Sequence, residues 1–389
     1  MFKIRTFNNI SNIIHDELDS DIFKISDSEQ KFEGALVRSA DLQNTEMPEE
    51  LLAIARAGAG YNNIPVDECS KKGVVVFNTP GANANAVKEL VMCGLLMSCR
   101  KVSESMQWLK EQSDAGEQGL DKLAEKHKNQ FVGPELAGKK LGVIGLGAIG
   151  VMVANAASQG LDMEVCGFDP FMSVDAAWHL SRSVKQAKNI DDLYRKCDFI
   201  TIHIPLNDKT RGMIGTQQLS LMKSEAVLLN FARGGLVDDD AVLQALEDGR
   251  LRRYVTDFPN DKLACRSGVL IFPHLGASTP ESEENCAKMA AKELKYYLTE
   301  GNIRNSVNMP SCELPRTSEV RLAIINRNEI NMVGQITAVL ARGKCNISHM
   351  INKSRGELAY TIIDVDCAVS NECLDDIKAI DGVIRVRVL

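Results

Sequence analysis

Residues 141–159, LGVIGLGAIGVMVANAASQ, decide the fold of the central part of the chain. A short apolar run leads into Gly145, Gly147 and Gly150, which are spaced as G-x-G-x-x-G, and a helical pattern follows. In such a strand–turn–helix the first glycine permits the tight turn, the second lets a ligand approach the backbone, and the third allows close packing of the helix on the strand. The stretch therefore predicts a βαβ unit of a doubly wound sheet with an anion site at the helix N-terminus.

An acidic residue follows this turn where a dinucleotide site needs one. Asp169 comes about twenty residues after the glycines and closes the next predicted strand, EVCGF at 164–168. A carboxylate there can accept hydrogen bonds from the adenosine ribose and would repel a 2′-phosphate. Together with Ala148 and Ile149 at the start of the helix, these residues predict an NAD site and favour NAD over NADP.

Further strand-like runs continue towards the C-terminus, at 199–205, 226–232, 253–258 and 269–274. Ligands of open parallel sheets bind outside the carboxyl ends of the strands, so the residues at those ends are the candidates for function. The candidates at these ends are His203, Pro205, Ala232, Arg233, Asp257, His274 and Gly276.

Two of these residues suit the oxidation of a hydroxy acid. Arg233, in NFARGG, has a fork of donors that could bind a substrate carboxylate, although a surface arginine in a turn is an equal alternative. His274, in PHLG, titrates in the right range to take a hydroxyl proton. His203 also lies at a strand end, and we favour it as a wall of the cofactor pocket rather than as a base.

A base histidine works better with a carboxylate that orients it and stabilises its charged form. Asp257 and Asp261, in TDFPNDKL, are the nearest upstream candidates. Asp257 could instead accept a hydrogen bond from the nicotinamide carboxamide, which leaves Asp261 as the expected partner of His274.

The rest of the chain divides around this series. Residues 1–90 alternate apolar runs with helical patterns and predict a second α/β unit, and 87–99 predicts a helix that is apolar on nearly all sides. Residues 280–300 predict one long helix that Gly301 ends. The stretch at 308–317 predicts a linker, and 318–389 has the order βαββαβ of a ferredoxin-like domain.

Composition narrows the classes of function. A net charge of −7 without clustered cations gives no expectation of nucleic-acid binding. The N-terminus lacks the apolar core of a signal peptide, and no stretch approaches the length of a membrane span, so we expect a cytoplasmic protein without membrane contact. The 11 cysteines are scattered singly, which fits a reducing compartment and predicts no metal site.

The glycine turn, Asp169, Arg233 and His274, in that order, resemble the D-2-hydroxyacid dehydrogenase family over about residues 1–310. The resemblance implies a Rossmann cofactor domain (93–283) inserted in a flavodoxin-like substrate domain (1–92 and 284–308). A linker (309–317) and an ACT-like domain (318–389) would follow. It also implies that Arg233, His274 and a carboxylate are catalytic; the family carboxylate is a Glu, whereas this chain offers Asp261, one methylene shorter.

Within the family the chain is most similar to members that oxidise D-3-phosphoglycerate with NAD in L-serine biosynthesis. Arg38 matches the arginine that contacts the substrate phosphate. Ala59 and Gly60, in RAGAG, match a loop whose backbone amides hold the substrate carboxylate, and Asn83 matches an asparagine that borders the substrate. Without the resemblance, Arg38 would be taken for a solvated cation at a strand end.

The C-terminal domain resembles an ACT domain, which in such enzymes often binds L-serine as an inhibitor. Asn328 and Asn346 match its ligand-contact positions. The His, Pro and Gly of the usual motif are replaced here, and Asn331 stands where the left-handed glycine would be. The family pattern also implies a homodimer or homotetramer.

Two other functions remain open at this point. The chain could act on another 2-hydroxy acid, such as glycerate, hydroxypyruvate, lactate or erythronate 4-phosphate, because a fold does not fix a substrate. It could also be an NADH-sensing binding protein, as are the C-terminal binding protein corepressors that share this fold.

Overall fold

The chain folds into two compact units in a computed structural model that describes all of residues 1–389. The first unit comprises residues 1–83 and 280–389, and the second comprises residues 84–279. The chain therefore leaves the first unit once, builds the second without interruption, and returns. The finer domain bounds expected from the sequence stay a prediction.

The second unit is built on a seven-stranded parallel sheet with the strand order β12-β11-β10-β9-β6-β7-β8. Its strands are β6 (Lys140–Ile144), β7 (Glu164–Phe168), β8 (Lys185–Gln186), β9 (Phe199–Ile202), β10 (Val227–Asn230), β11 (Arg253–Thr256) and β12 (Val269–Ile271). The order runs both ways from β6, which is the topological switch point of a doubly wound sheet. Every strand expected in this region is confirmed, and β8 is an addition.

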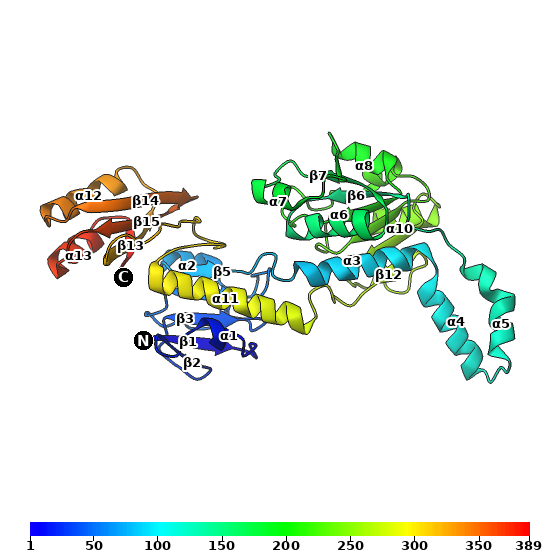
Figure 1. The fold of residues 1–389 in the computed structure, drawn as a ribbon, viewed down its shortest axis with the longest axis horizontal. Helices are drawn as coiled ribbons and strands as arrows, with labels where there is room; N and C mark the ends of the chain where they lie inside the picture. The colour runs from blue at the N-terminus through cyan, green and yellow to red at the C-terminus, as the bar shows by residue number, and fades with distance from the viewer. The chain divides into compact units, whose positions relative to one another are not determined.

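Helices cover both faces of this sheet, as Figure 1 shows. One face packs against α3 (Ala84–Cys99), α6 (Ala148–Gly160) and α7 (Val174–His179). The other packs against α8 (Ile190–Lys196), α9 (Thr216–Leu221) and α10 (Asp239–Glu247). A helical arm of α4 (Val102–Asp114), α5 (Leu120–His127) and the 3₁₀ turn η1 (Lys128–Phe131) extends from the body of this unit (Figure 1). The two layers of helices bury every residue of β9 and β10, which are mostly apolar.

The first unit contains a five-stranded parallel sheet of order β2-β1-β3-β4-β5. Its strands are β1 (Phe2–Phe7), β2 (Phe23–Ser26), β3 (Gly34–Val37), β4 (Ala53–Arg56) and β5 (Val75–Phe77). The helices α1 (Ile14–Glu17) and α11 (Pro280–Glu300) cover one face, and α2 (Val66–Lys71) covers the other. The long helix predicted at 280–300 is thus confirmed, with Gly301 at φ +69° directly after it.

The C-terminal part of the first unit is a four-stranded antiparallel sheet of order β14-β15-β13-β16. Its elements are β13 (Val320–Arg327), α12 (Met332–Arg342), β14 (Ile347–Arg355), β15 (Leu358–Val365), α13 (Asn371–Lys378) and β16 (Val383–Val388). The predicted βαββαβ order is confirmed. Asn331 adopts φ +66°, so this asparagine does supply the left-handed turn before α12.

One face of the four-stranded sheet packs on the C-terminal half of α11, and we call this contact the α11 seam. Leu294, Tyr297 and Leu298 of α11 share a core with Ile325 and Tyr360 of the sheet. Polar side chains of the sheet also donate to the carbonyls at the end of α11. These bonds are Arg387 Nη2 to Leu298 O (2.7 Å), Arg321 Nη1 to Glu300 O (2.9 Å) and the Tyr360 hydroxyl to Gly301 O (2.5 Å).

The segment expected to be a linker is packed rather than loose. Met309 and Cys312 are fully buried, and Ile303 and Cys312 exchange backbone hydrogen bonds. Arg355 of β14 also donates to Ser306 O at 2.8 Å. The C-terminal sheet is therefore fixed to the first unit along this segment and along the α11 seam. None of the helices combines the length and the apolar character needed to span a lipid bilayer.

Candidate active site

The glycine-rich turn lies between β6 and α6 in the second unit. Gly145 has φ +91°, and a Cβ there would come within 2.5 Å of His203 O. A Cβ on Gly150 would collide with Gly145 O, so helix and turn can only pack this closely with glycine. No atom lies within 4 Å of the position that a Cβ of Gly147 would take, which leaves the backbone there open to a ligand. This cradle fits a pyrophosphate at the start of α6, where Ala148 and Ile149 form the first turn.

Asp169 follows β7 and faces this turn. Its Oδ2 accepts the backbone N–H of Leu146 at 2.8 Å, and its Oδ1 accepts the N–H of Phe171 at 2.8 Å. These bonds hold the carboxylate beside the glycine-rich turn, and each oxygen keeps a lone pair for a ribose hydroxyl. The position agrees with the predicted role of Asp169 in NAD binding.

His203 follows β9 and is held as a neutral ring. Burial lowers the pKa of His203 to about 3. Its Nε2 lies 3.0 Å from Thr201 Oγ1, whereas its Nδ1 is buried and has no hydrogen-bond partner. A ring that stays neutral at physiological pH cannot hold a proton between reaction steps. This supports the prediction that His203 lines the cofactor pocket rather than acting as the base. The exposed Pro205 follows two residues later.

Arg233 lies in the loop after β10, which Asn230 braces. Asn230 Nδ2 donates to Arg233 O at 2.9 Å, and Asn230 Oδ1 accepts the N–H of Ala232 at 3.2 Å. The Arg233 side chain is exposed, makes no ion pair, and donates from Nη1 to Ala232 O at 2.7 Å. Most of its donors are therefore available to a carboxylate.

The His274 turn is clamped by Asp257, the residue after β11. Asp257 is 2% exposed, and its Oδ1 and Oδ2 accept the backbone N–H groups of Leu275 and Gly276, each at 2.7 Å. Burial raises the pKa of Asp257, although these two amides act in the opposite direction. The carboxylate thus fixes the backbone on both residues that follow His274. The predicted contact of Asp257 with the nicotinamide stays a prediction.

His274 itself sits in a strained backbone conformation. Its φ is +56°, a left-handed value that a non-glycine residue adopts at a cost of about 1–3 kcal/mol. Its exposed ring packs against the Phe258 ring, with the two centroids 5.1 Å apart. The clamp by Asp257 explains how the turn persists, and the result is an accessible imidazole in a fixed place.

Asp261, the expected partner of His274, is exposed and forms no hydrogen bond or ion pair in this structure. The carboxylate that acts electrostatically on the same turn is that of Asp257. No hydrogen bond or ion pair joins Asp261 to His274 in this structure, and their pairing stays a prediction.

Arg38 follows β3 in the first unit and is paired rather than merely solvated. Its Nη2 lies 2.5 Å from Oε1 of Glu283, in the first turn of α11. Both side chains are about two-fifths exposed, at 41% and 43%. An ion pair this exposed contributes little stability, so an incoming anion can replace Glu283 at low cost.

The loop after β4 presents unused backbone donors beside Arg38. The N–H groups of Ala59 and Gly60 donate no hydrogen bond, whereas the carbonyl of Ala59 accepts from Asn78 Nδ2 at 2.6 Å. Arg56 Nε donates to Arg38 O at 3.1 Å and so ties the loop to the arginine. Two free amides in a braced loop suit a carboxylate, as predicted. Asn83, the last residue of the first unit, is half-buried, and its side chain forms no hydrogen bond.

The two predicted effector residues lie at opposite ends of one strand. Asn328 Nδ2 donates to Gly356 O at 3.1 Å, directly beyond the C-terminal end of β14. Asn346 directly precedes the N-terminal end of β14. Nine residues of strand separate the two asparagines, which is a span of about 30 Å. The structure therefore does not bring them together within one chain.

Three residues with clear positioning roles escaped the sequence analysis. Asn230 braces the Arg233 loop, Asn78 braces the Ala59 loop, and Glu283 pairs with Arg38. Asn78 and Asn230 each follow or end a buried strand, and an asparagine there commonly bonds the local backbone. The location of Asn78 and Asn230 at strand ends could therefore have indicated their roles from the sequence. Nothing in the sequence near Glu283 indicates its pairing with Arg38.

Comparison with known proteins now adds to this geometry. Residues 92–276 match the family described as D-isomer specific 2-hydroxyacid dehydrogenase, NAD binding domain. The D-3-phosphoglycerate dehydrogenase of Escherichia coli K12 is 32% identical over 354 residues, which are 88% of this chain and 82% of that protein. That of Methanocaldococcus jannaschii is 35% identical over 326 residues, which are 82% of this chain but only 58% of that longer protein.

Solved structures agree with these matches. The NAD⁺-bound 3-phosphoglycerate dehydrogenase of Entamoeba histolytica covers 79% of this chain and 98% of its own, at 25% identity and a TM-score of 0.60. An NAD complex of a D-isomer specific 2-hydroxyacid dehydrogenase from Lactobacillus delbrueckii shares the fold at 22% identity and a TM-score of 0.62. NAD is thus the cofactor, and its binding by the glycine cradle and Asp169 stays a prediction that their geometry fits.

Proposed function

The chain belongs to the D-isomer specific 2-hydroxyacid dehydrogenase family, and from this premise we propose that it oxidises D-3-phosphoglycerate to 3-phosphohydroxypyruvate, the first step of L-serine biosynthesis. The observation that carries the proposal is the clamped His274 turn. It lies at the same carboxyl edge of the sheet as the Arg233 loop and the glycine cradle. NAD, when bound, accepts the hydride from C2 of the hydroxy acid.

The chain's own residues supply the remaining roles. Arg233 binds the carboxylate and polarises the C2 oxygen through its free donors. An imidazole nitrogen of His274 takes the hydroxyl proton, and Asp257 positions the turn that carries this ring. Asp261 is the second carboxylate proposed to support His274. Its neighbours Asn260 and Lys262 donate hydrogen bonds to Asp239 and Asp240, whereas the Asp261 side chain has no partner of its own.

Substrate recognition is assigned to the first unit. The free N–H groups of Ala59 and Gly60 hold the carboxylate end of the substrate, and Asn83 borders it. Arg38 binds the phosphate by exchanging its exposed Glu283 partner for the doubly charged group. The relatives named as D-3-phosphoglycerate dehydrogenases support this substrate over other hydroxy acids.

The reduction of four keto acids tests the substrate. NADH oxidation is measured with phosphohydroxypyruvate, hydroxypyruvate, pyruvate and glyoxylate under identical conditions. We expect a strong preference for phosphohydroxypyruvate. We also expect Arg38→Ala to raise its KM by about tenfold or more, as loss of a charge-assisted hydrogen bond does, with little effect on hydroxypyruvate.

Lys31→Ala serves as the matched control, since Lys31 is an exposed cation of the same unit that pairs only with Glu50. Preference for an unphosphorylated acid would keep the dehydrogenase and discard the phosphate role. Absence of turnover with intact NADH binding would favour a binding protein instead.

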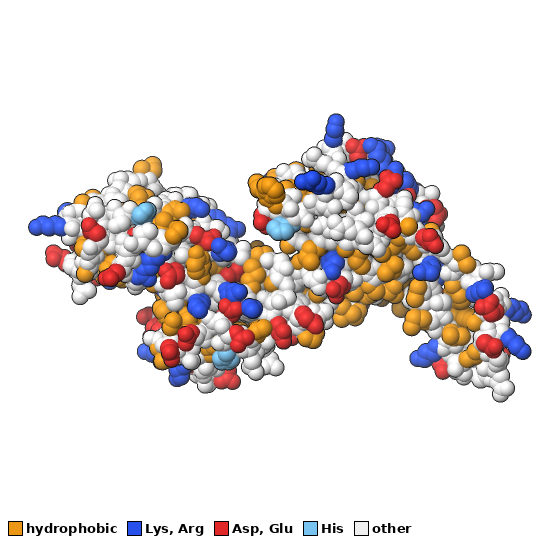
Figure 2. All heavy atoms as spheres, in the orientation of Figure 1, with side chains coloured by type: hydrophobic (Ala, Val, Ile, Leu, Met, Phe, Trp, Pro, Cys, Tyr) orange, Lys and Arg blue, Asp and Glu red, His pale blue; other side chains and the backbone are white.

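We propose that L-serine is an effector of this protein and that the chain forms a homo-oligomer, because the first proposal depends on the second. Asn328 and Asn346 are separated by the length of β14, so a single small ligand can touch both only if they come from two copies of the chain. Exposed apolar side chains gather on the second unit over α3 and along the helical arm, as Figure 2 shows, and they favour such pairing. They include Leu96, Met106 and Val132, which are 46%, 68% and 71% exposed.

Two measurements test this paired arrangement. Sedimentation should show a dimer or tetramer, and saturating L-serine should slow turnover in the wild-type chain but not in Asn346→Ala. A monomer, or turnover unchanged by L-serine, would contradict the effector site. The proposed compartment is the cytoplasm, which the nine free cysteines support.

A further inference from the structure

Two of the 11 cysteines, Cys345 and Cys367, are joined by a disulfide, whereas nine are free thiols. The scattered spacing did not predict this pair, and the reducing compartment that we expected from the cysteines stays a prediction. In a reducing compartment such as the proposed cytoplasm, a disulfide is usually transient and either catalytic or redox-sensing.

The disulfide joins two connections of the C-terminal sheet. Cys345 lies between α12 and β14, and Cys367 lies between β15 and α13, 22 residues later. Cys345 is 7% exposed and belongs to the core under α12 and α13, whereas Cys367 is half-buried. The bond can therefore be reached from the Cys367 side.

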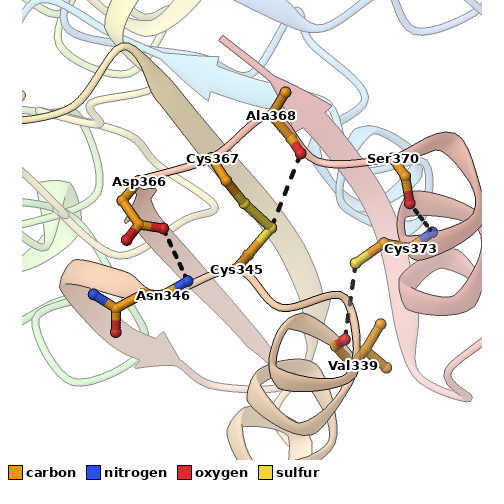
Figure 3. Close-up of a disulfide and its surroundings, with 8 residues drawn as sticks. All are labelled: Val339, Cys345, Asn346, Asp366, Cys367, Ala368, Ser370 and Cys373. Atoms are coloured by element: carbon orange, nitrogen blue, oxygen red, sulfur yellow. Dashed lines mark hydrogen bonds between the residues drawn. A yellow bond between two sulfur atoms is a disulfide. The ribbon is translucent and has the colours of Figure 1, made fainter.

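The residues beside the disulfide form a small clamp, shown in Figure 3. Asn346 N donates to Asp366 Oδ1 at 3.0 Å, and Asp366 N donates to Asn346 O at 3.1 Å. Directly beyond this clamp the pairing of β14 with β15 shifts register between Ile347 and His349. A bulge of this kind interrupts the ladder, so the clamp and the disulfide contribute to the order of the start of β14. Thr317 and Ser318 also form side-chain hydrogen bonds there, to His349 and Ser348.

We propose that Cys345 and Cys367 form a reversible thiol–disulfide site whose closed form orders the segment that carries Asn346. A dithiol reductant opens it: one of its thiolates attacks Cys367 Sγ, the Sγ–Sγ bond breaks, and Cys345 leaves as a thiolate that takes a proton. The second thiol of the reductant then attacks the mixed disulfide, closes a cyclic disulfide on the reductant, and releases Cys367 as a thiol. Two electrons and two protons pass to the cysteine pair, and an oxidised dithiol reverses the exchange.

The third cysteine nearby, Cys373, does not take part. It is buried at the start of α13, where its Sγ lies 3.9 Å from Val339 O, and burial raises the pKa of its thiol. A thiol that stays protonated is a poor nucleophile towards a disulfide. Cys373→Ser is therefore the matched control for variants of the pair.

Alkylation and hydrogen exchange test the site in the full-length protein. After equilibration with oxidised dithiothreitol, peptide mapping should show 345 and 367 linked and protected from N-ethylmaleimide, and reduced dithiothreitol should make both react. Reduction should also lower amide protection at 345–348 and 366–369 by about tenfold or more, while β13 keeps its protection. Cys345→Ser with Cys367→Ser should show the low protection in either buffer, whereas Cys373→Ser should respond as wild type does.

Free alkylation of both cysteines after the oxidising step, or equal amide protection in the two states, would overturn the proposal. A second consequence rests on the proposed effector role: reduction should weaken inhibition by L-serine by about tenfold, in step with the lost order at Asn346. L-serine that inhibits neither form would contradict the effector role alone, because alkylation and exchange decide the disulfide site without it.

Discussion

The carboxyl edge of the seven-stranded sheet and the α11 seam both contain ionisable side chains, but their backbone strain and hydrogen bonding differ. At the sheet edge His274 adopts a left-handed backbone, and His203 keeps a buried nitrogen without a partner. At the seam Arg321 and Asp364 are completely buried and hydrogen-bonded to each other through two bonds, of 2.6 and 2.9 Å.

The difference matches the roles of the two regions: the sheet edge carries the proposed catalytic residues, whereas the α11 seam attaches the C-terminal sheet to the first unit. Strain and unpaired polar atoms persist where a ligand or a reaction uses them, as in the His274 turn. Charges that only hold one part of a fold to another are paired as completely as Arg321, because a buried unpaired charge costs several kcal/mol. Substitutions at the sheet edge should therefore lower turnover, whereas substitutions at the α11 seam should lower stability.

The largest effect is expected at the sheet edge, from His274→Asn. Asparagine tolerates the left-handed backbone but cannot take the hydroxyl proton. Turnover should fall about 10²–10⁴-fold, the usual contribution of a general base, while NADH affinity measured by fluorescence stays near that of wild type. Equal losses of turnover and NADH affinity would mean that His274 holds the cofactor rather than acting as the base.

At the seam, Arg321→Met should destabilise the fold without a specific catalytic defect. It leaves Asp364 buried and unpaired, which typically costs about 3–5 kcal/mol. Thermal unfolding should move to clearly lower temperature, while KM and kcat below the transition stay close to wild type. Adding Asp364→Leu should restore most of the stability, and a double variant no better than the single one would contradict this account of the pair.

Two residues of α11 are exceptions to the satisfied pairing near the seam. The buried Tyr297 hydroxyl has no hydrogen-bond partner. Glu293 is 6% exposed, Asn305 Nδ2 donates to its Oε1 at 2.7 Å, and its Oε2 has no partner. Burial raises the pKa of Glu293 to about 8, and the bond from Asn305 opposes this only in part.

Stability should therefore fall as the pH rises towards 8. An unfolded glutamate loses its proton near pH 4.3, at about its ordinary pKa, so between there and about 8 the folded state holds one more proton. The free energy of unfolding should then drop by up to about 1.4 kcal/mol per pH unit. Glu293→Gln should flatten the dependence of the free energy of unfolding on pH, measured by urea titrations. Glu284→Gln, an exposed change on the same helix, should leave that dependence unchanged. An unchanged pH dependence in Glu293→Gln would show that Glu293 ionises freely in the folded protein.

Much of the fold could be predicted, because its signals are local. The glycine turn, the Gly301 stop of α11 and the left-handed Asn331 each depend on a few neighbouring residues. The packing of Met309 and Cys312 in the expected linker could not be predicted, because it depends on the α11 seam, which joins parts of the chain that are distant in sequence.

The candidate site likewise contains residues that could be predicted from local sequence and contacts that could not. Arg233, Asp169 and His274 could be proposed as site residues because each follows a strand end that is visible in the sequence. The clamp of Asp257 on Leu275 and Gly276 could not, since it joins two strand ends across an intervening loop. The Arg38–Glu283 pair spans 245 residues, and the Cys345–Cys367 bond joins two connections whose approach only the antiparallel sheet determines.

The length and stiffness of helix α11 affect how precisely the first unit holds Glu283. Its first turn carries Glu283, the partner of Arg38, and its last turn is gripped by Arg321 and Arg387. Its 21 residues make a rod about 30 Å long, and a helix with its backbone bonds intact turns as one piece. A tilt of about 5° at the gripped end would carry the Glu283 end through about 3 Å, roughly the length of a hydrogen bond. The hydrogen bonds from the two arginines, together with the packing of α11 on the five-stranded sheet, thus set how precisely this helix holds the partner of Arg38.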